Sequence, residues 1–287
     1  MKFVGIITIG LALVACESDQ YSSAEESMMS SSVEESIVPS PYIISGVYKD
    51  VPPSDPTTVI LDQTVMAYLE NGEYFVLRGR LGNPPEPGSA TPIIAEVFYG
   101  HITQTDNSLV SSDLKYFDLA KSFSGVGNLE ASYASNTSTI NGSMTHEVSV
   151  EGLTGAYRPS PWGIGLFGMS GLSVMRDSAA SKTSQIAEVI GDYSGTVFMP
   201  SGVEPVVFNI TASGAISATG TETGCALGGQ LSAGTGSYRI QLFGGTDCGV
   251  YSGQTLNGLA IMTNGFFIAA ILDAAETGGI FFTVPVP

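Results

Sequence analysis

Basic residues are scarce in this 287-residue chain, which has 10 Lys and Arg against 27 Asp and Glu. The formal net charge of −17 removes the attraction that drives binding to a phosphate backbone. We therefore expect no nucleic-acid partner and no anionic membrane surface held through charge. Long amphipathic helices are also missing, because no helical repeat of apolar positions is sustained along the chain.

Histidine is scarce as well, with only His101 and His146. A Ser or Cys nucleophile needs a base beside it, and the sequence has no Gly-x-Ser-x-Gly elbow. It also has no Cys-x-x-Cys pair and no calcium loop of the Asp-x-Asp-x-Asp-Gly type. We therefore predict no cofactor, no metal site and no enzymatic activity.

One glycine motif matches a known cofactor-binding pattern. Residues Gly163–Gly168 fit the Gly-x-Gly-x-x-Gly dinucleotide pattern, but Pro159–Trp162 stands where the preceding strand should be and no helix follows. We interpret the motif as a glycine-rich loop or strand edge.

Apolar residues make up 43% of the chain, and its 35 glycines follow no three-residue period, which excludes a disordered chain, a coiled coil and a collagen. After Tyr42, apolar and polar residues alternate, as in Leu129–Tyr133, Ile140–Met144 and Tyr238–Leu242. This period of two indicates antiparallel strands with one dry face and one wet face. Only Ser184–Ile190 has room for a helical turn or two.

The same alternation places both histidines. Continued from Ile140 and Met144, it puts His146 on the apolar face, where we expect an edge or core histidine with its hydrogen bonds satisfied. His101 precedes Ile102 on the wet side and is predicted to be solvated.

Three short pairs between β-rich runs predict hairpins, because they supply the positive φ of a two-residue turn. They are Asn71-Gly72, Ser213-Gly214 and Asn264-Gly265. A weak repeat accompanies these turns. Tyr48, which ends Gly46–Tyr48, precedes the turn glycine Gly72 by 24 residues, and Tyr193, which ends Gly191–Tyr193, precedes the turn glycine Gly214 by 21. The chain is therefore predicted to be all-β, with two small antiparallel barrels or sandwiches at residues 42–176 and 177–287.

The N-terminus has the pattern of an export leader. Met1-Lys2 is followed by an uncharged run to Ala15, too short to span a bilayer as an anchor, so residues 1–15 are predicted to be a signal peptide. The junction Leu13–Cys16 resembles the lipobox of bacterial lipoproteins, which implies acyl chains on Cys16 and stable membrane anchoring. The alternative is a plain secretory signal with an incidental cysteine.

Residues 16–41 are Ser-rich, with six acidic and no basic residues between Glu17 and Ser40. This composition predicts a disordered tether. In bacterial lipoproteins, Asp directly after the acylated Cys usually marks inner-membrane retention. Here the residue is Glu17, so the resemblance implies the outer membrane of a Gram-negative cell, facing either the periplasm or the outside.

With Cys16 taken by lipid, Cys225 and Cys248 remain as an even pair in an oxidising compartment. We expect a disulfide that stabilises the fold by about 3 kcal/mol in the chain-entropy model. A metal pair or a reactive thiol is the alternative, but no His lies nearby to support it.

Glycine, aromatic and cysteine residues recur through both halves of the chain. They include Gly46–Tyr48, Asn71–Tyr74, Leu129–Tyr133, Gly224-Cys225, Gly228-Gly229, Tyr238–Ile240, Cys248-Gly249 and Gly279–Phe282. These positions resemble a family of uncharacterised lipoproteins of Gram-negative bacteria over most of residues 44–284. The resemblance implies shared turns and packing but no chemistry, and the similarity to transferrin-binding-type surface lipoproteins is at the level of the fold.

A stretch that includes Tyr157, Arg158 and the single Trp162 combines residue types enriched at binding hot spots. It is a candidate binding loop, with packing of Trp162 under a linker as the alternative.

Taken together, these features predict a lipid-anchored envelope lipoprotein that binds a protein, glycan or small-molecule ligand, or has a structural role in the envelope. The alternative is an exported hydrolase with two carboxylates in one cleft. The strand carboxylates Glu130, Glu147 and Glu151 fall on polar faces, where solvation explains them.

Overall fold

The computed structural model describes residues 42–51, 63–80, 93–119, 123–148, 167–199, 202–263 and 265–286. All of these lie in one compact unit, Pro39–Pro287. No α-helix occurs in the described ranges, and the only helical turns there are two short 3₁₀ segments, η1 (Ile186–Glu188) and η2 (Gly249–Tyr251). The predicted all-β class is confirmed, and η1 lies where a helical turn was expected. The leader, Cys16, the tether, Tyr157, Arg158 and Trp162 lie outside the described residues.

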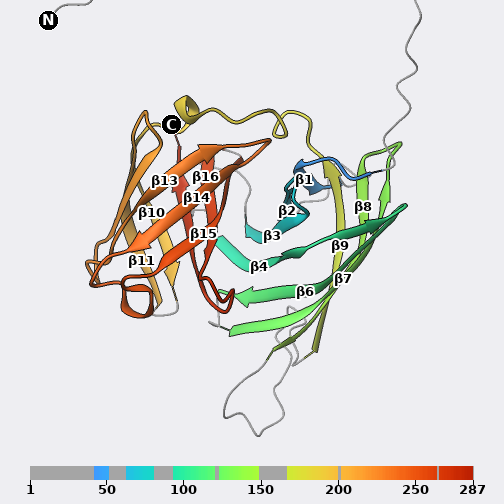
Figure 1. The fold of residues 1–287 in the computed structure, drawn as a ribbon, viewed down its shortest axis with the longest axis horizontal. Coiled ribbons are helices and arrows are strands. Elements are labelled where there is room, and N and C mark those ends of the chain that lie inside the picture. Colours follow the sequence, from blue (N-terminus) through green and yellow to red (C-terminus); the bar gives the residue numbers. More distant parts are fainter. Residues whose placement is uncertain are drawn as a thin grey trace, which may run out of the picture. The chain divides into compact units, whose positions relative to one another are not determined.

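The first sheet has nine strands in the order β4-β3-β2-β1-β9-β8-β7-β6-β5, and an additional pairing of β4 with β6 closes eight of them into a ring. Figure 1 shows this sheet, blue to yellow-green, curling round on itself. We call this ring the first barrel. Its strands are β1 (Gly46–Asp50), β2 (Gln63–Tyr68), β3 (Glu73–Arg80), β4 (Ile93–His101), β6 (Ser108–Asp118), β7 (Phe123–Ala134), β8 (Thr139–Val148) and β9 (Phe167–Arg176), with the short β5 (Thr103–Thr105) paired to β6.

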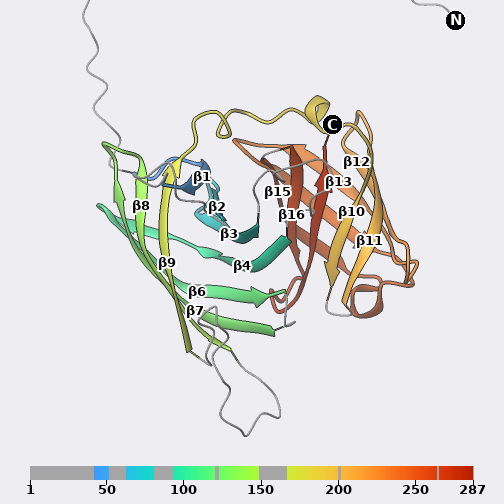
Figure 2. The ribbon, with the colours of Figure 1, turned by 180° about the vertical axis from the view of Figure 1, so that it is seen from behind.

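The remaining eight strands close into the second barrel, in sequence order. Figure 2 shows it from behind, in orange and red. Its strands are β10 (Gly191–Met199), β11 (Gly202–Ile210), β12 (Ala215–Gly220), β13 (Ala226–Ala233), β14 (Tyr238–Gly244), β15 (Thr255–Thr263), β16 (Phe266–Leu272) and β17 (Gly279–Pro285). The strand pairs of both rings are antiparallel, so of the two predicted architectures the structure has the barrel.

Hairpins form at all three predicted positions, but two of the turns are longer than expected. Leu69 pairs with Glu73 and Thr211 with Ala215, which leaves three residues in each loop. The last residue of each loop is a glycine with positive φ, +88° at Gly72 and +79° at Gly214. This is the type I turn followed by a left-handed residue that commonly closes three-residue hairpins. At Gly214 an added Cβ would also lie 2.5 Å from the carbonyl oxygen of Leu231.

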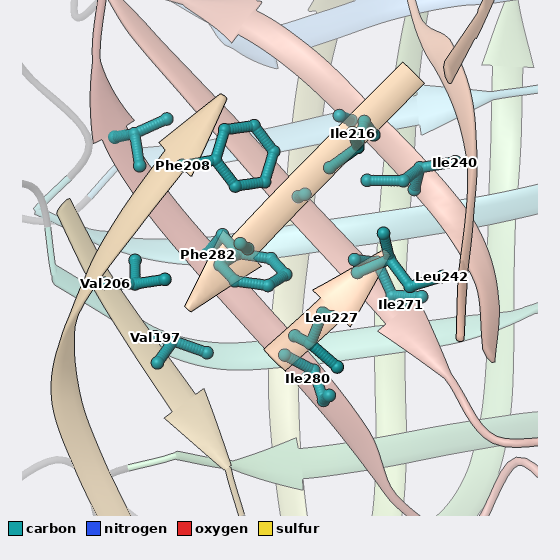
Figure 3. Packing of buried hydrophobic residues seen from close by; sticks show 14 of the residues in the cluster. Val197, Val206, Phe208, Ile216, Leu227, Ile240, Leu242, Ile271, Ile280 and Phe282 are labelled. Atoms are coloured by element: carbon teal, nitrogen blue, oxygen red, sulfur yellow. The ribbon is translucent and has the colours of Figure 1, made fainter. Parts of the chain in front are cut away.

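The second barrel is filled by side chains. Every second residue of its strands points inward, and Figure 3 shows Phe208 and Phe282 beside Val197, Val206 and Ile216 in this interior. The ring centroids of Phe208 and Phe282 are 5.5 Å apart. The interior is therefore a packed core without room for a large ligand.

The outer faces of the two barrels pack against each other and form one shared apolar cluster. Outward residues of β1–β4 pack with outward residues of β15–β17, so β16 is buried along its whole length. Its alternate residues serve two cores: Phe267 and Ile271 face the second barrel's interior, and Ile268 faces the first barrel. A hydrogen bond of 3.0 Å from Tyr99 to Glu276 lies in the same contact region. Burial on both faces explains why β16 has a continuous apolar run and not the usual alternation.

Candidate functional site

A row of polar side chains crosses one end of the first barrel's interior. Thr64 on β2, Arg78 on β3, Glu96 on β4 and Asp118 on β6 are successive partners across neighbouring strands. Strand alternation places them on the same face as the core residues Met66, Val76, Phe98 and Tyr116. We call these four residues the polar row.

The guanidinium of Arg78 organises one half of this row. It donates to the carbonyl oxygen of Gly171 at 2.8 Å and lies 3.8 Å from a carboxylate oxygen of Glu96. The hydroxyl of Tyr116 donates to the other Glu96 oxygen at 3.1 Å. The row brings two carboxylates and one guanidinium together at the end of the barrel.

His146 on β8 lies beside the row and is only 5% exposed. Its ring stacks on Tyr116 with centroids 4.0 Å apart, and Phe98 meets it edge-on at 5.9 Å. The predicted inward placement is confirmed, but the expectation of a satisfied histidine is wrong. Neither ring nitrogen has a hydrogen-bond partner among the described residues, because the aromatic neighbours offer none. Native proteins seldom leave a buried polar group without a hydrogen-bond partner, so the position of His146 is unusual.

The surroundings of His146 keep its ring neutral. Burial lowers the pKa of His146, the nearby charge of Arg78 lowers it further, and Asp118 opposes both effects. A neutral imidazole offers one N–H donor and one acceptor nitrogen, so His146 suits a ligand with both kinds of polar group.

A small pocket of about 190 Å³ adjoins this end of the first barrel. It lies where the end of β6 meets the end of β10 and the turn between β16 and β17. Its lining residues are Phe117, Asp118, Leu119, Ser124, Phe198, Met199, Thr277, Gly278, Gly279 and Phe281. Asp118 is among these lining residues, but its side chain faces the interior of the first barrel, whereas Phe117 beside it packs in the shared apolar cluster.

A wider groove of about 530 Å³ crosses β6–β9. Several of its lining residues alternate with the inward ones and so belong to the outer face of the barrel, among them Val126 and Met169, which are 58% and 77% exposed. The remaining lining residues are Ser112, Gly127, Asn128, Thr145, His146 and Glu147. Polar side chains line this groove too, and His146 is the residue that it shares with the surroundings of the polar row.

His101 is exposed, as predicted, but it also has a partner. Its Nδ1 lies 2.8 Å from a carboxylate oxygen of Asp113, and Ser111 donates to the other oxygen at 2.8 Å. Desolvation raises the pKa of Asp113, but the hydrogen bonds from His101 and Ser111 outweigh it and hold that pKa below its usual range. Ser111 bonds the carboxylate and not the imidazole, so the arrangement is not that of a nucleophile activated by histidine.

A further buried carboxylate, Glu204, has a structural role in the second barrel. It accepts backbone N–H groups of Glu222 and Thr223 at 2.9 Å each and the Thr223 hydroxyl at 2.7 Å. Desolvation raises the pKa of Glu204, but these hydrogen bonds outweigh it and lower that pKa. The carboxylate thus holds the turn that leads to Cys225.

The predicted disulfide is present between Cys225 and Cys248, whose Cα atoms lie 4.4 Å apart. Glu130 and Glu147 are exposed, as their polar-face positions predicted, and Glu151 lies outside the described residues. Of the glycine motif, Phe167 and Gly168 form the start of β9, and residues 163–166 lie outside.

The sequence analysis missed Arg78, Glu96 and Asp118. Tyr74, Val76 and Arg78 occupy every second position of β3 and so share its inward face. The alternation that placed His146 inside the barrel would also have placed Arg78 there. The meeting of β4 with β6 depends on ring closure and had no local signal.

In the ranges that the structure describes, no three His, Cys, Asp or Glu side chains are grouped to hold a metal ion. Within the same ranges, no helix has the length and apolar character needed to cross a membrane.

No known protein family matches the chain, and no curated protein matches it. Among solved structures, it is similar to Aeromonas veronii immune modulator A, with a TM-score of 0.37 and 10% sequence identity, over 84% of this chain and 93% of that one. A likeness at this level carries no argument about function.

Proposed function

We propose that this chain is a lipid-anchored lipoprotein of the bacterial outer membrane that acts as a binding module and not as an enzyme. Its ligand would be a small molecule taken at the polar end of the first barrel. The observation that most supports this proposal is His146, a buried imidazole beside the polar row. Neither of its ring nitrogens has a hydrogen-bond partner among the described residues. Concave sites with a few convergent polar groups are the usual form of small-molecule sites.

The anchoring part of the proposal is supported by the cysteines. Cys225 and Cys248 are bridged, as is typical of exported proteins, and Cys16 is then the one remaining cysteine of the chain, directly after the predicted leader. Its resemblance to a lipobox cysteine and the Glu17 that follows it support an anchor in the outer membrane.

Metabolic labelling tests the anchor. In cells fed an alkyne analogue of palmitate, the wild-type chain should take up label and Cys16→Ala should not. Protease added to intact cells then distinguishes the two faces of the outer membrane, since only a surface-exposed chain is cleaved. An unlabelled wild-type chain contradicts the lipid anchor.

A carboxylate-based hydrolase is the second candidate, because Glu96 and Asp118 face each other across β4 and β6. Against it, the Arg78 guanidinium and the Tyr116 hydroxyl contact the two oxygens of Glu96, which already engages this carboxylate with protein groups. Hydrolysis of glycosides or esters by the wild type, lost in both Glu96→Gln and Asp118→Asn, would replace the binding proposal with this one.

A further inference from the structure

The pocket of about 190 Å³ lies between the two barrels and is lined by residues of their outer faces. On the first barrel, Phe117 and Ser124 are direct partners across β6 and β7, so their side chains share one face. Phe117 belongs to the shared apolar cluster, and this face is therefore the outer one. On the second barrel, Phe198 and Phe281 are direct partners across β10 and β17 and pack in the same cluster. All four side chains face the contact between the barrels.

The walls of the pocket are mainly aromatic. The ring of Phe117 meets the ring of Phe281 across the barrel contact, with centroids 5.6 Å apart and planes tilted by 52°. Leu119 and Phe198 line the pocket beside them and pack against the same cluster. Aromatic rings prefer tilted or offset-stacked aromatic neighbours, so these walls suit a further aromatic ring.

The volume of the pocket limits its ligand to about one ring. About 190 Å³ is below the roughly 300–1,000 Å³ of sites for drug-sized ligands. In another protein, an apolar cavity of about 150 Å³ is large enough to bind benzene. The pocket between the barrels therefore has room for a single aromatic ring with a small substituent.

Among the described residues that line the pocket, none presents a charge to it. Asp118 is the one with an ionisable side chain, and that side chain points into the first barrel. Ser124 and Thr277 supply the polar side chains, and both are exposed. A charged group moved from water into such a place has no partner, whereas one or two hydrogen bonds satisfy a neutral amide or hydroxyl. The lining therefore favours a neutral ligand.

We propose that this pocket binds a neutral molecule with a single aromatic ring, which lies among Phe117, Phe198 and Phe281. A small polar substituent of the ligand points to the exposed hydroxyl of Ser124. The inference goes beyond the proposed function, because His146 stacks on Tyr116 inside the first barrel and this pocket lies outside it. The bound ring contacts both barrels.

Three probes of one shape and different charge test the proposal. Calorimetric titration of the full-length protein with benzamide should show binding with one site per chain. Benzoate and benzamidinium, which replace the amide by an anion and by a cation, should each bind at least about tenfold more weakly, because the pocket has no partner for their charge. No binding of benzamide, or an ion that binds as tightly as benzamide, would overturn the proposal.

Variants that fill the pocket assign the site. Ser124→Phe places a large side chain in the pocket from its exposed edge and should lower the affinity for benzamide at least about tenfold. Ser132→Phe, the same change at another exposed residue on the outer face of β7, is the matched control and should bind like the wild type.

Melting curves of each variant check folding. Thr277→Trp, which fills the pocket from the exposed turn between β16 and β17, keeps the test decisive if Ser124→Phe does not fold. Unchanged affinity for benzamide in a folded Ser124→Phe or Thr277→Trp variant would overturn the assignment.

This outcome is separable from the lipid anchor. A chain labelled at Cys16 that binds no benzamide leaves the anchor standing and removes the pocket ligand. A chain that binds benzamide without label does the reverse.

Discussion

At the scale of single residues, the first barrel holds an unusual buried group. His146 stacks on Tyr116 and lies near Arg78 and Asp118, with no hydrogen bond to either ring nitrogen from any described residue. Burial lowers its pKa, so the folded protein resists protonation at a pH where the unfolded chain accepts it. The unfolded chain therefore binds more protons below about pH 6.5, the ordinary pKa of histidine.

This linkage predicts a loss of stability on mild acidification. The free energy of unfolding should fall as pH drops from about 7.5 to 5.5, above the range in which carboxylates titrate. His146→Phe, which keeps an aromatic ring on Tyr116, should remove this slope, as measured by urea unfolding at each pH. Val207→Ala, a substitution at an exposed residue that does not titrate, is the control and should keep the slope. An unchanged slope in His146→Phe would contradict the prediction.

At the scale of the strand, β16 shows what the packing of two barrels does to a sequence. Phe266–Leu272 is apolar at every position, while most other strands alternate. A lone barrel has a wet outer face, so half of these residues would be exposed there. Because the outer face of the first barrel covers the outward residues of β16, the residues on both faces of this strand are buried.

Substitutions on the two faces of β16 should therefore be equally costly. Ile268→Ala removes a side chain from the contact between the barrels and Ile271→Ala removes one from the barrel interior, and both residues are fully buried. Each should lower the free energy of unfolding by about 2–4 kcal/mol. Val207→Ala on the exposed face of β11 should change it by less than about 0.5 kcal/mol. Chemical denaturation measures all three, and an Ile268→Ala value near that of Val207→Ala would argue against the shared cluster.

At the scale of the whole molecule, the segment between β9 and β10 belongs to the structure of both barrels. The Ser181 hydroxyl accepts the N–H of Val47 at 2.9 Å in the first barrel, and the N–H of Ser184 donates to Gly234 at 2.9 Å in the second. Lys49 pairs with Asp177 at 2.8 Å. Together with the shared apolar cluster, these contacts couple the two rings energetically.

The coupling predicts one cooperative unfolding transition. Scanning calorimetry should give a single peak, and the double variant Cys225→Ser, Cys248→Ser should shift that whole peak to lower temperature. Loss of the bridge, which spans 23 residues, should cost about 3 kcal/mol. Two separate transitions, with only one moved by the variant, would show that the barrels unfold independently.

The local sequence by itself determined the strands, the hairpin positions and the disulfide. Alternation, turn glycines and cysteine number are short-range signals that residues such as Ile140, Gly214 and Cys225 carry without reference to the rest of the chain. It also placed His146 on the dry face of its strand.

Only the tertiary structure decided the choice of barrel over sandwich, the polar row, the pocket and the burial of β16 on both faces. Each depends on which distant strands meet. Glu96 and Asp118 become neighbours through closure of the first ring, and Ile268 is dry because a second barrel covers it. Ring closure and barrel contact arise from the summed packing of many strands, so no single segment encodes them.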